Sequence, residues 1–209
     1  MPGSQQSIAT LRAQMPLAPP GQRIGLMGGT FNPPHEGHLI CAVTALRRLQ
    51  LDQLWWMVTP GNPLKSGEGL PSLEARMAAS RRLATDPRIK VTGFEAALSS
   101  PYTYETLRYV TRRFRGVHFI WVMGADNLAG FDRWQRWRDI ARLVPMAVVD
   151  RPGWRFKALA LPAAGSLARY RVPETLAAGL ALMMPPAWTL LSTRLSEASS
   201  TALRAENGK

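Results

Sequence analysis

The apolar run from Val117 to Met123 limits the fold of this chain more than any other feature. Its only polar residue is His118, and it is followed directly by Gly124. A short run that is apolar on both faces is typical of a strand in a parallel sheet, where helices cover the two sides. The run therefore predicts an α/β protein.

Shorter apolar segments separated by amphipathic ones extend this pattern over the chain. The expected strands are Arg23–Gly28, Leu54–Thr59, Ile89–Gly93, Val117–Met123, Met146–Asp150 and Ala187–Leu191. The expected helices are His38–Leu49, Ser72–Ala84, Tyr104–Phe114 and Trp134–Leu143, with a short last helix from about Ser200. We interpret 154–184 as helical or irregular. The alternation predicts a doubly wound, mostly parallel, Rossmann-like six-stranded sheet of order 3-2-1-4-5-6, with helices on both faces.

Ligands of such sheets bind beyond the carboxyl ends of the strands, where the strand order reverses. Here that point lies between the first and fourth strands, and the segment from Gly28 to His38 follows the first of them. Its sequence is GGTFNPPHEGH. Glycines at a strand end allow a phosphate to approach backbone N–H groups, and the following helix N-terminus favours an anion.

His35 and His38 are three residues apart and can lie on one side of the first helical turn. Two imidazoles there could donate hydrogen bonds to the oxygens of a bound triphosphate. A zinc site is the alternative function of a His-x-x-His pair. It is disfavoured because His118 and Cys41 are the remaining soft ligands and belong to other elements.

Composition limits the remaining classes. The 209 residues carry a formal charge of +12, which indicates an anionic partner, but the arginines are too dispersed to predict a nucleic-acid surface. We expect no membrane partner, since no apolar stretch approaches the roughly 18–20 residues of a membrane helix. The single cysteine fits a reducing cytoplasm. Residues 1–22 lack acidic residues and an apolar core, so we expect a disordered tail before one domain over 23–209.

The motif GTFNPPHEGH resembles the signature of the HxGH nucleotidyltransferase superfamily. The resemblance implies that Gly28, Gly29, Thr30 and Phe31 hold ATP, with His35 and His38 as catalytic residues. In that superfamily a second motif near the C-terminus starts a helix at the phosphates. Its counterpart here is SSTALR, which implies ATP ligands at Ser199, Ser200 and Thr201 and a catalytic Arg204.

The middle of the chain resembles nicotinate-nucleotide adenylyltransferases in particular. The matching segments are VTPGNPLK, ending at Lys65; YTYETL, starting at Tyr102; MGADNL, around Gly124 and Asp126; FDRWQRW, around Trp134; and RPG, starting at Arg151. The resemblance implies that Gly124 and Asp126 lie beside the ribose and adenine of ATP. It places Lys65, Tyr102, Thr103 and Trp134 at nicotinic acid mononucleotide. A cationic pyridinium ring should bind well to an aromatic face, although helix packing is the alternative role of Trp134.

The implied reaction joins the mononucleotide to the adenylyl group of ATP, releasing pyrophosphate and giving deamido-NAD in NAD biosynthesis. We expect Mg²⁺ held mainly by substrate phosphates, with no protein metal site, and a homo-oligomer stays open. Two rivals are a phosphopantetheine adenylyltransferase and a nucleotide- or RNA-binding protein without turnover. The family often has Asp at Asn32 and His before Lys65, where this chain has Leu64, and it commonly has a further C-terminal helix.

Overall fold

The computed structural model describes residues 15–60, 70–98 and 100–193. Its core is a six-stranded sheet in which every pair of neighbouring strands is parallel, in the order β3-β2-β1-β4-β5-β6. The strands are β1 (Arg23–Gly29), β2 (Gln53–Val58), β3 (Ile89–Thr92), β4 (His118–Gly124), β5 (Met146–Val149) and β6 (Trp188–Leu191). The predicted fold class and strand order are confirmed.

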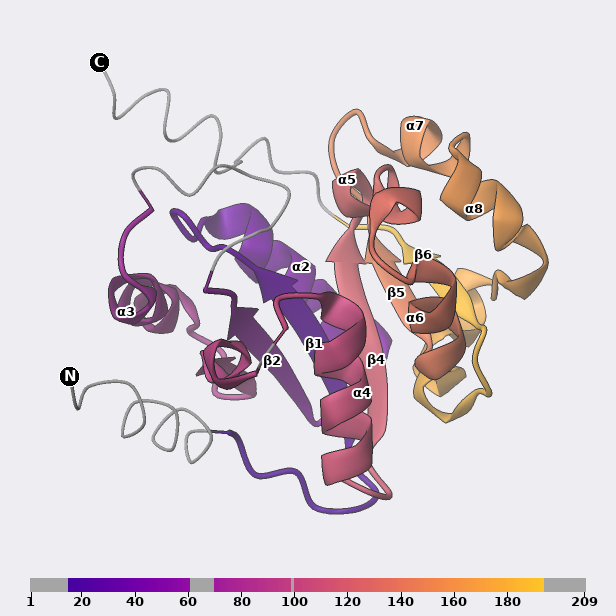
Figure 1. Cartoon of the computed structure of the whole chain (residues 1–209). Helices are drawn as coiled ribbons and strands as arrows, with labels where there is room; N and C mark the ends of the chain where they lie inside the picture. The colour runs from indigo at the N-terminus through magenta and orange to yellow at the C-terminus, as the bar shows by residue number, and fades with distance from the viewer. Residues whose placement is uncertain (1–14, 61–69, 99, 194–209) are drawn as a thin grey trace.

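Helices cover both faces of the sheet, as Figure 1 shows with α4 in front and α2 behind. The α-helices are α2 (Glu36–Arg48), α3 (Leu73–Leu83), α4 (Thr103–Arg113), α5 (Ala125–Leu128), α6 (Trp137–Leu143), α7 (Arg155–Leu159) and α8 (Pro162–Ser166). The 3-10 helices are η1 (Phe94–Ala97), η2 (Phe131–Arg133), η3 (Ala168–Tyr170) and η4 (Glu174–Leu182). The segment 154–184 is therefore a series of short helical turns.

Two apolar cores lie between the sheet and its helices, one on each face of the sheet. On one face, Leu107 and Val110 of α4 and Ile140 of α6 pack against β1 and β4. On the other face, Ala42 and Leu46 of α2 pack against the same sheet. β1 and β4 are parallel neighbours, so their carboxyl ends lie side by side at one end of the sheet. The site is expected at this end.

Two predictions about local structure are wrong. The helix expected over Trp134–Leu143 begins only at Trp137, because Arg136 adopts a left-handed backbone conformation with φ 57° that cannot belong to an α-helix. Residues 15–22, which we expect to belong to a disordered tail, are instead packed on the domain. Met15 and Ala18 pack against the α4-side core, and Gln22 accepts a hydrogen bond from the His118 amide at 2.8 Å. Residues 1–14 lie outside the described part of the chain.

Candidate active site

The two histidines of the first motif meet at the start of α2. His35 is the N-cap residue, and its Nδ1 accepts a hydrogen bond from the Gly37 amide at 3.1 Å. His38 lies in the first turn, and its Nδ1 accepts from the His35 amide at 3.2 Å. The ring centroids are 3.9 Å apart. The sequence spacing therefore brings the two imidazoles together as predicted, in a reciprocal capping arrangement.

These backbone contacts determine which ring nitrogen is a donor. Because Nδ1 of both His35 and His38 accepts a backbone N–H, the neutral rings carry their proton on Nε2. Each ring then has one donor left for a ligand. Neither Nδ1 is free to take a proton unless the helix cap opens. The arrangement is suited to donating hydrogen bonds to an anion and poorly suited to general base catalysis.

The electrostatics keep both rings neutral. Burial, and to a smaller extent the positive charge of Arg151, lowers the pKa of His35 to about 4. Burial, His35 and Arg151 together lower the pKa of His38 to about 3. Both imidazoles are thus uncharged in the free protein near pH 7, and they act there as hydrogen-bond donors without a net charge.

Phe31 packs against His38 of this pair. Its ring is buried and lies with its centroid 4.7 Å from that of His38 and 5.2 Å from that of Trp56. Its backbone is in the left-handed region, with φ 47°. The side chain of Phe31, predicted at the ATP site, is therefore used in packing beneath His38, and its backbone remains as the group that could face a nucleotide.

At two of the predicted ATP positions, side chains of other residues lie so close to the backbone that a Cβ atom would clash with them, which favours glycine. A Cβ atom at Gly28 would lie 2.9 Å from the ring of Trp121. A Cβ atom at Gly124 would clash with Asp126 Oδ1 and lie 3.2 Å from Arg151 Nε. Gly28 is the penultimate residue of β1 and Gly124 is the last residue of β4, so the absence of side chains there allows other residues to fill the carboxyl edge of the sheet.

Asp126 lies beside Arg151, with 3.4 Å between Oδ2 and Nη1. Its Oδ1 is buried and has no hydrogen-bond partner among the described residues. Arg151 also influences the pKa of both histidines, so it links the first motif to the Asp126 segment. Arg151 is not among the site residues that the sequence predicts, although the RPG segment belongs to the resemblance. Its position directly after the fifth predicted strand, at the same edge of the sheet, is a further signal.

Arg76 is a second residue that the sequence did not point to. Although it belongs to α3, its buried guanidinium donates to the backbone carbonyls of Thr30 at 2.8 Å and Thr59 at 2.7 Å. It also donates to the carbonyls of Pro71 at 2.9 Å and Pro60 at 3.3 Å. Arg76 thereby ties the loop after β1, which carries the first motif, to the loop after β2.

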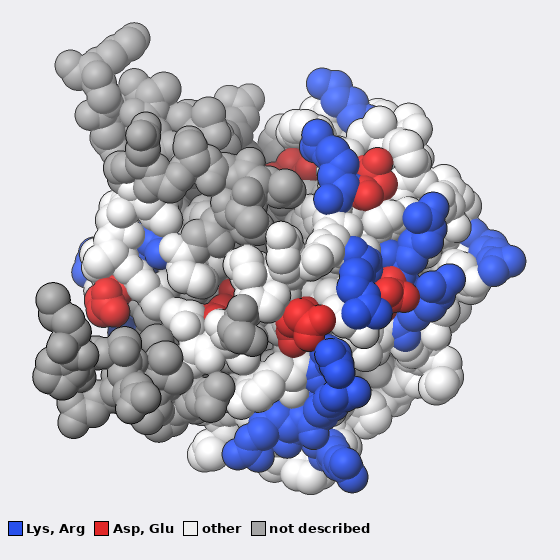
Figure 2. Space-filling model, in the orientation of Figure 1, with Lys and Arg blue, Asp and Glu red and all other residues white. Residues whose placement is uncertain are grey.

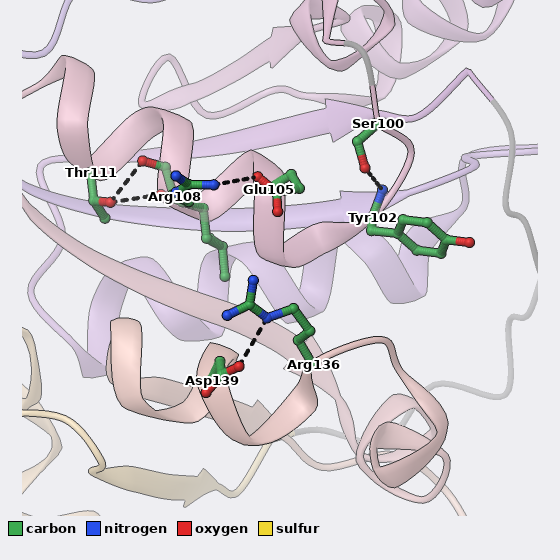
Figure 3. A network of polar contacts seen from close by, with 8 residues as sticks. Ser100, Tyr102, Glu105, Arg108, Thr111, Arg136 and Asp139 are labelled. Atoms are coloured by element: carbon green, nitrogen blue, oxygen red, sulfur yellow. Dashed lines mark hydrogen bonds and ion pairs between the residues drawn. The ribbon is translucent and has the colours of Figure 1, made fainter.

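Three of the residues predicted at nicotinic acid mononucleotide lie on the α4 face of the sheet: Tyr102, Thr103 and Trp134. Tyr102 is the N-cap residue of α4, is 37% exposed, and its side chain points away from the polar network in Figure 3. Thr103 is the first residue of α4. Trp134 is half-buried in the turn before α6, with its ring centroid 6.0 Å from that of Trp121.

Trp121 is also the ring that occupies the space next to Gly28. Trp134 is therefore connected, through one indole, to the end of β1. Lys65, Ser199, Ser200, Thr201 and Arg204 lie outside the described residues.

The described residues contain no group of three or more His, Cys, Asp and Glu side chains that could hold a metal ion. Cys41 is buried in α2, and burial raises the pKa of its thiol to about 12, so the thiol is neutral in the free protein. Among the described residues, no third His, Cys, Asp or Glu side chain joins the histidine pair in a metal-binding group. No helix there is long and apolar enough to cross a bilayer.

Comparison with known proteins identifies the family. The cytidylyltransferase-like family model matches residues 26–206. A protein of Bradyrhizobium sp. (strain BTAi1 / ATCC BAA-1182), named "Probable nicotinate-nucleotide adenylyltransferase", is 53% identical over 186 residues, which cover 89% of this chain and 97% of that protein. A protein of the same name from Rhizobium meliloti (strain 1021) is 55% identical over 181 residues, covering 87% and 96%.

Solved structures agree on the fold. The Plasmodium falciparum nicotinic acid mononucleotide adenylyltransferase complexed with NaAD matches with a TM-score of 0.65 at 16% identity, covering 88% of this chain and 83% of its own. Sequence identity, motif content and strand order therefore lead to one conclusion. The chain is a nucleotidyltransferase of the cytidylyltransferase-like family and belongs to its nicotinate-nucleotide adenylyltransferases.

Proposed function

We propose that His35 and His38 catalyse adenylyl transfer from ATP to nicotinic acid mononucleotide by donating Nε2–H hydrogen bonds to phosphate oxygens. The observation that carries this assignment is the pair of backbone N–H groups bound to the two Nδ1 atoms. A neutral imidazole held in this tautomer is a preorganised donor, which costs no reorganisation when negative charge develops in the transition state.

The reaction needs no protein base. The 5′-phosphate of the mononucleotide has a second pKa of about 6, so it is largely a dianion near pH 7. One of its oxygens forms a bond to the α-phosphorus of ATP. The bond from that phosphorus to the bridging oxygen of the β-phosphate breaks, and pyrophosphate leaves. The protein has to align two polyanions and stabilise their charge.

The remaining ATP contacts follow the resemblance. We propose that the backbone from Gly28 to Phe31 faces the phosphates, and that Gly124 and Asp126 bind the ribose and adenine. Asp126 Oδ1 is suited to that role because it is buried and without a hydrogen-bond partner among the described residues. Ser199, Ser200, Thr201 and Arg204 complete this side in the proposal, as phosphate ligands.

The mononucleotide site in the proposal uses Trp134 as the aromatic face for the pyridinium ring, with Tyr102 and Thr103 beside it and Lys65 at the phosphate. The half-burial of Trp134 is compatible with this assignment, because it leaves part of the ring accessible to a ligand.

Mg²⁺ fits this site as a companion of the substrates. The described residues at the first motif offer hydrogen-bond donors and no cluster of carboxylates, so substrate phosphates and water would supply the ligands. When bound, the ion neutralises part of the charge on the leaving pyrophosphate. His35 and His38 stabilise the oxygens that remain.

The test is pyrophosphate release from ATP with nicotinic acid mononucleotide, nicotinamide mononucleotide and phosphopantetheine as separate acceptors. We expect the acid mononucleotide to be used with the highest kcat/KM. Preference for phosphopantetheine would refute the substrate assignment. If the folded protein released no pyrophosphate with any of the three acceptors, it would be a binding protein and not an enzyme.

A further inference from the structure

The turn that carries Trp134 has an unfavourable backbone. It runs from η2 into α6, and Arg136, its N-cap residue, has φ 57° and ψ 35°. An L-residue with a long side chain rarely occupies this left-handed region, so the surrounding contacts have to hold it there. Arg136 is two residues from Trp134, and its conformation therefore sets the direction of the chain next to the indole.

The side chain of Arg136 makes two contacts that hold this conformation. Its Nε donates to Asp139 Oδ2 at 2.9 Å, which closes the first turn of α6 (Figure 3). Its guanidinium carbon lies 3.8 Å from the centroid of the Tyr104 ring. An arginine stacked at this distance on an aromatic face is attracted by the negative face of the ring.

Tyr104 lies at the start of α4, next to Thr103 and two residues after Tyr102. The Tyr104–Arg136 contact thus joins the two segments that carry the proposed nicotinate ligands. On the far side, the edge-on contacts of Trp134 with Trp121 and Phe131 hold the indole against the core. The distance between the start of α4 and the Trp134 indole is therefore held by two sets of contacts. One is the Tyr104–Arg136 contact, and the other is the packing of Trp134 against the core.

We propose that Tyr104 and Arg136 are positioning residues, which set the width of the nicotinate pocket by holding the Trp134 turn against α4. This inference rests on the proposed placement of the mononucleotide at Trp134, Tyr102 and Thr103. Neither Tyr104 nor Arg136 is assigned a contact with substrate. They act through Trp134, and their effect falls on capture of the mononucleotide and not on ATP.

The basic surface provides the rival explanation. Basic side chains, all of them arginines, gather over α4 and α6 (Figure 2), and loss of any one of them could weaken the attraction of an anionic substrate. Arg142 is the matched control. It is an exposed arginine of α6 that also binds Asp139, with 3.4 Å between Nη1 and Oδ1, and no aromatic contact is recorded for it.

The experiment measures KM for each substrate, kcat and Tm in Tyr104→Ala, Arg136→Ala, the double variant and Arg142→Ala. We expect each of the first two changes to raise KM for the mononucleotide about 2–5-fold, the size of an exposed cation–π contact. KM for ATP should stay within error. The double variant should resemble either single one, because both remove the same contact. Tyr104→Phe and Arg136→Lys should recover most of the affinity.

Arg136→Gly separates the side chain from the backbone. Glycine adopts φ 57° without strain, so a backbone role alone predicts wild-type KM, whereas the contact with Tyr104 predicts the same rise as in Arg136→Ala. Three results would overturn the inference: an equal rise in Arg142→Ala, additive effects in the double variant, or equal changes in both KM values. If Trp134→Ala leaves KM for the mononucleotide unchanged, the proposed pocket itself fails, independently of this pair.

Discussion

The proposed phosphate side and the proposed nicotinate side of this site are built differently. On the phosphate side, His35 caps a thirteen-residue helix, His38 lies in its first turn, and both are held by backbone N–H groups. On the nicotinate side, Trp134 lies in a turn between short helices and is held by other side chains. In the proposal, the histidines that stabilise the transferred phosphate are therefore held by backbone hydrogen bonds. The tryptophan that binds the acceptor is held by side-chain contacts, which substitutions can change.

The largest expected effect tests the backbone-held part. His38→Ala removes one preorganised donor and should lower kcat by about 10²–10³, with little change in KM for ATP, as for loss of one oxyanion donor. Steady-state kinetics of pyrophosphate release measure both constants. The matched control is His118→Ala, since His118 begins β4 at the opposite edge of the sheet. A His38→Ala variant with normal kcat would remove this residue from the mechanism.

The next effect tests the side-chain-held part. Trp134→Ala should raise KM for nicotinic acid mononucleotide about 5–30-fold, because one aromatic contact to a cationic ring is worth about 1–2 kcal/mol. ATP binding should be almost unchanged. If Trp134 only packed, the change would instead cost about 3–5 kcal/mol of stability and affect both substrates. Kinetics and thermal denaturation of the same variant distinguish the two results, and Trp134→Phe should be intermediate.

Acid should destabilise the phosphate side in particular. The pKa of His38 is about 3 in the folded protein and about 6.5 when unfolded, so the unfolded chain binds more protons between these values. Stability is therefore fully present above pH 6.5 and is lost as pH falls through that window. At pH 5 the loss that His38 alone contributes is at most about 2 kcal/mol, or about 4–8 °C in Tm. The measurement is Tm against pH for wild type and His38→Asn, whose curve should be flatter.

The smallest expected effect concerns the support beneath α4. Deleting residues 1–22 removes the packing of Met15 and Ala18 and the contact of Gln22 with His118. We expect a fall of about 2–8 °C in Tm, corresponding to about 1–2 kcal/mol. Deleting only 1–14, which composition alone predicts to be a tail, is the control and should have less effect. Equal Tm values for both deletions would show that 15–22 does not support this face.

The sequence predicts the sheet well because its signal is local. Each strand is a short apolar run, and the alternation with helices leaves few topologies. The histidine pair is also predictable, since both residues lie within one helical turn after a strand. The turn at Trp134 is not. Trp134, Trp137 and Ile140 are spaced three residues apart, which is compatible with a helix. Only the contacts of Arg136 with Tyr104 and Asp139 explain the left-handed conformation of Arg136.

Arg76 could not be predicted for a different reason. Its partners are backbone carbonyls, which every residue has, so no pattern of side chains marks them. Composition predicts a tail for Met15 and Gln22, because it shows how little apolar surface this segment has. It does not show where that surface packs, and in the structure Met15 packs against the α4-side core. The series of turns over 154–184 contains Pro162 and Pro173, which interrupt any longer helical period.

The carbonyl cage around Arg76 has an electrostatic consequence at long range. No carboxylate forms an ion pair with Arg76 among the described residues, so oriented peptide dipoles solvate its charge without cancelling it. A full positive charge thus remains just beneath the loops that follow β1 and β2. Protonation of acidic groups cannot neutralise or release it. Arg76 therefore contributes to this edge of the sheet a positive charge that no ion-pair partner among the described residues cancels, and this charge favours the approach of two polyanionic substrates.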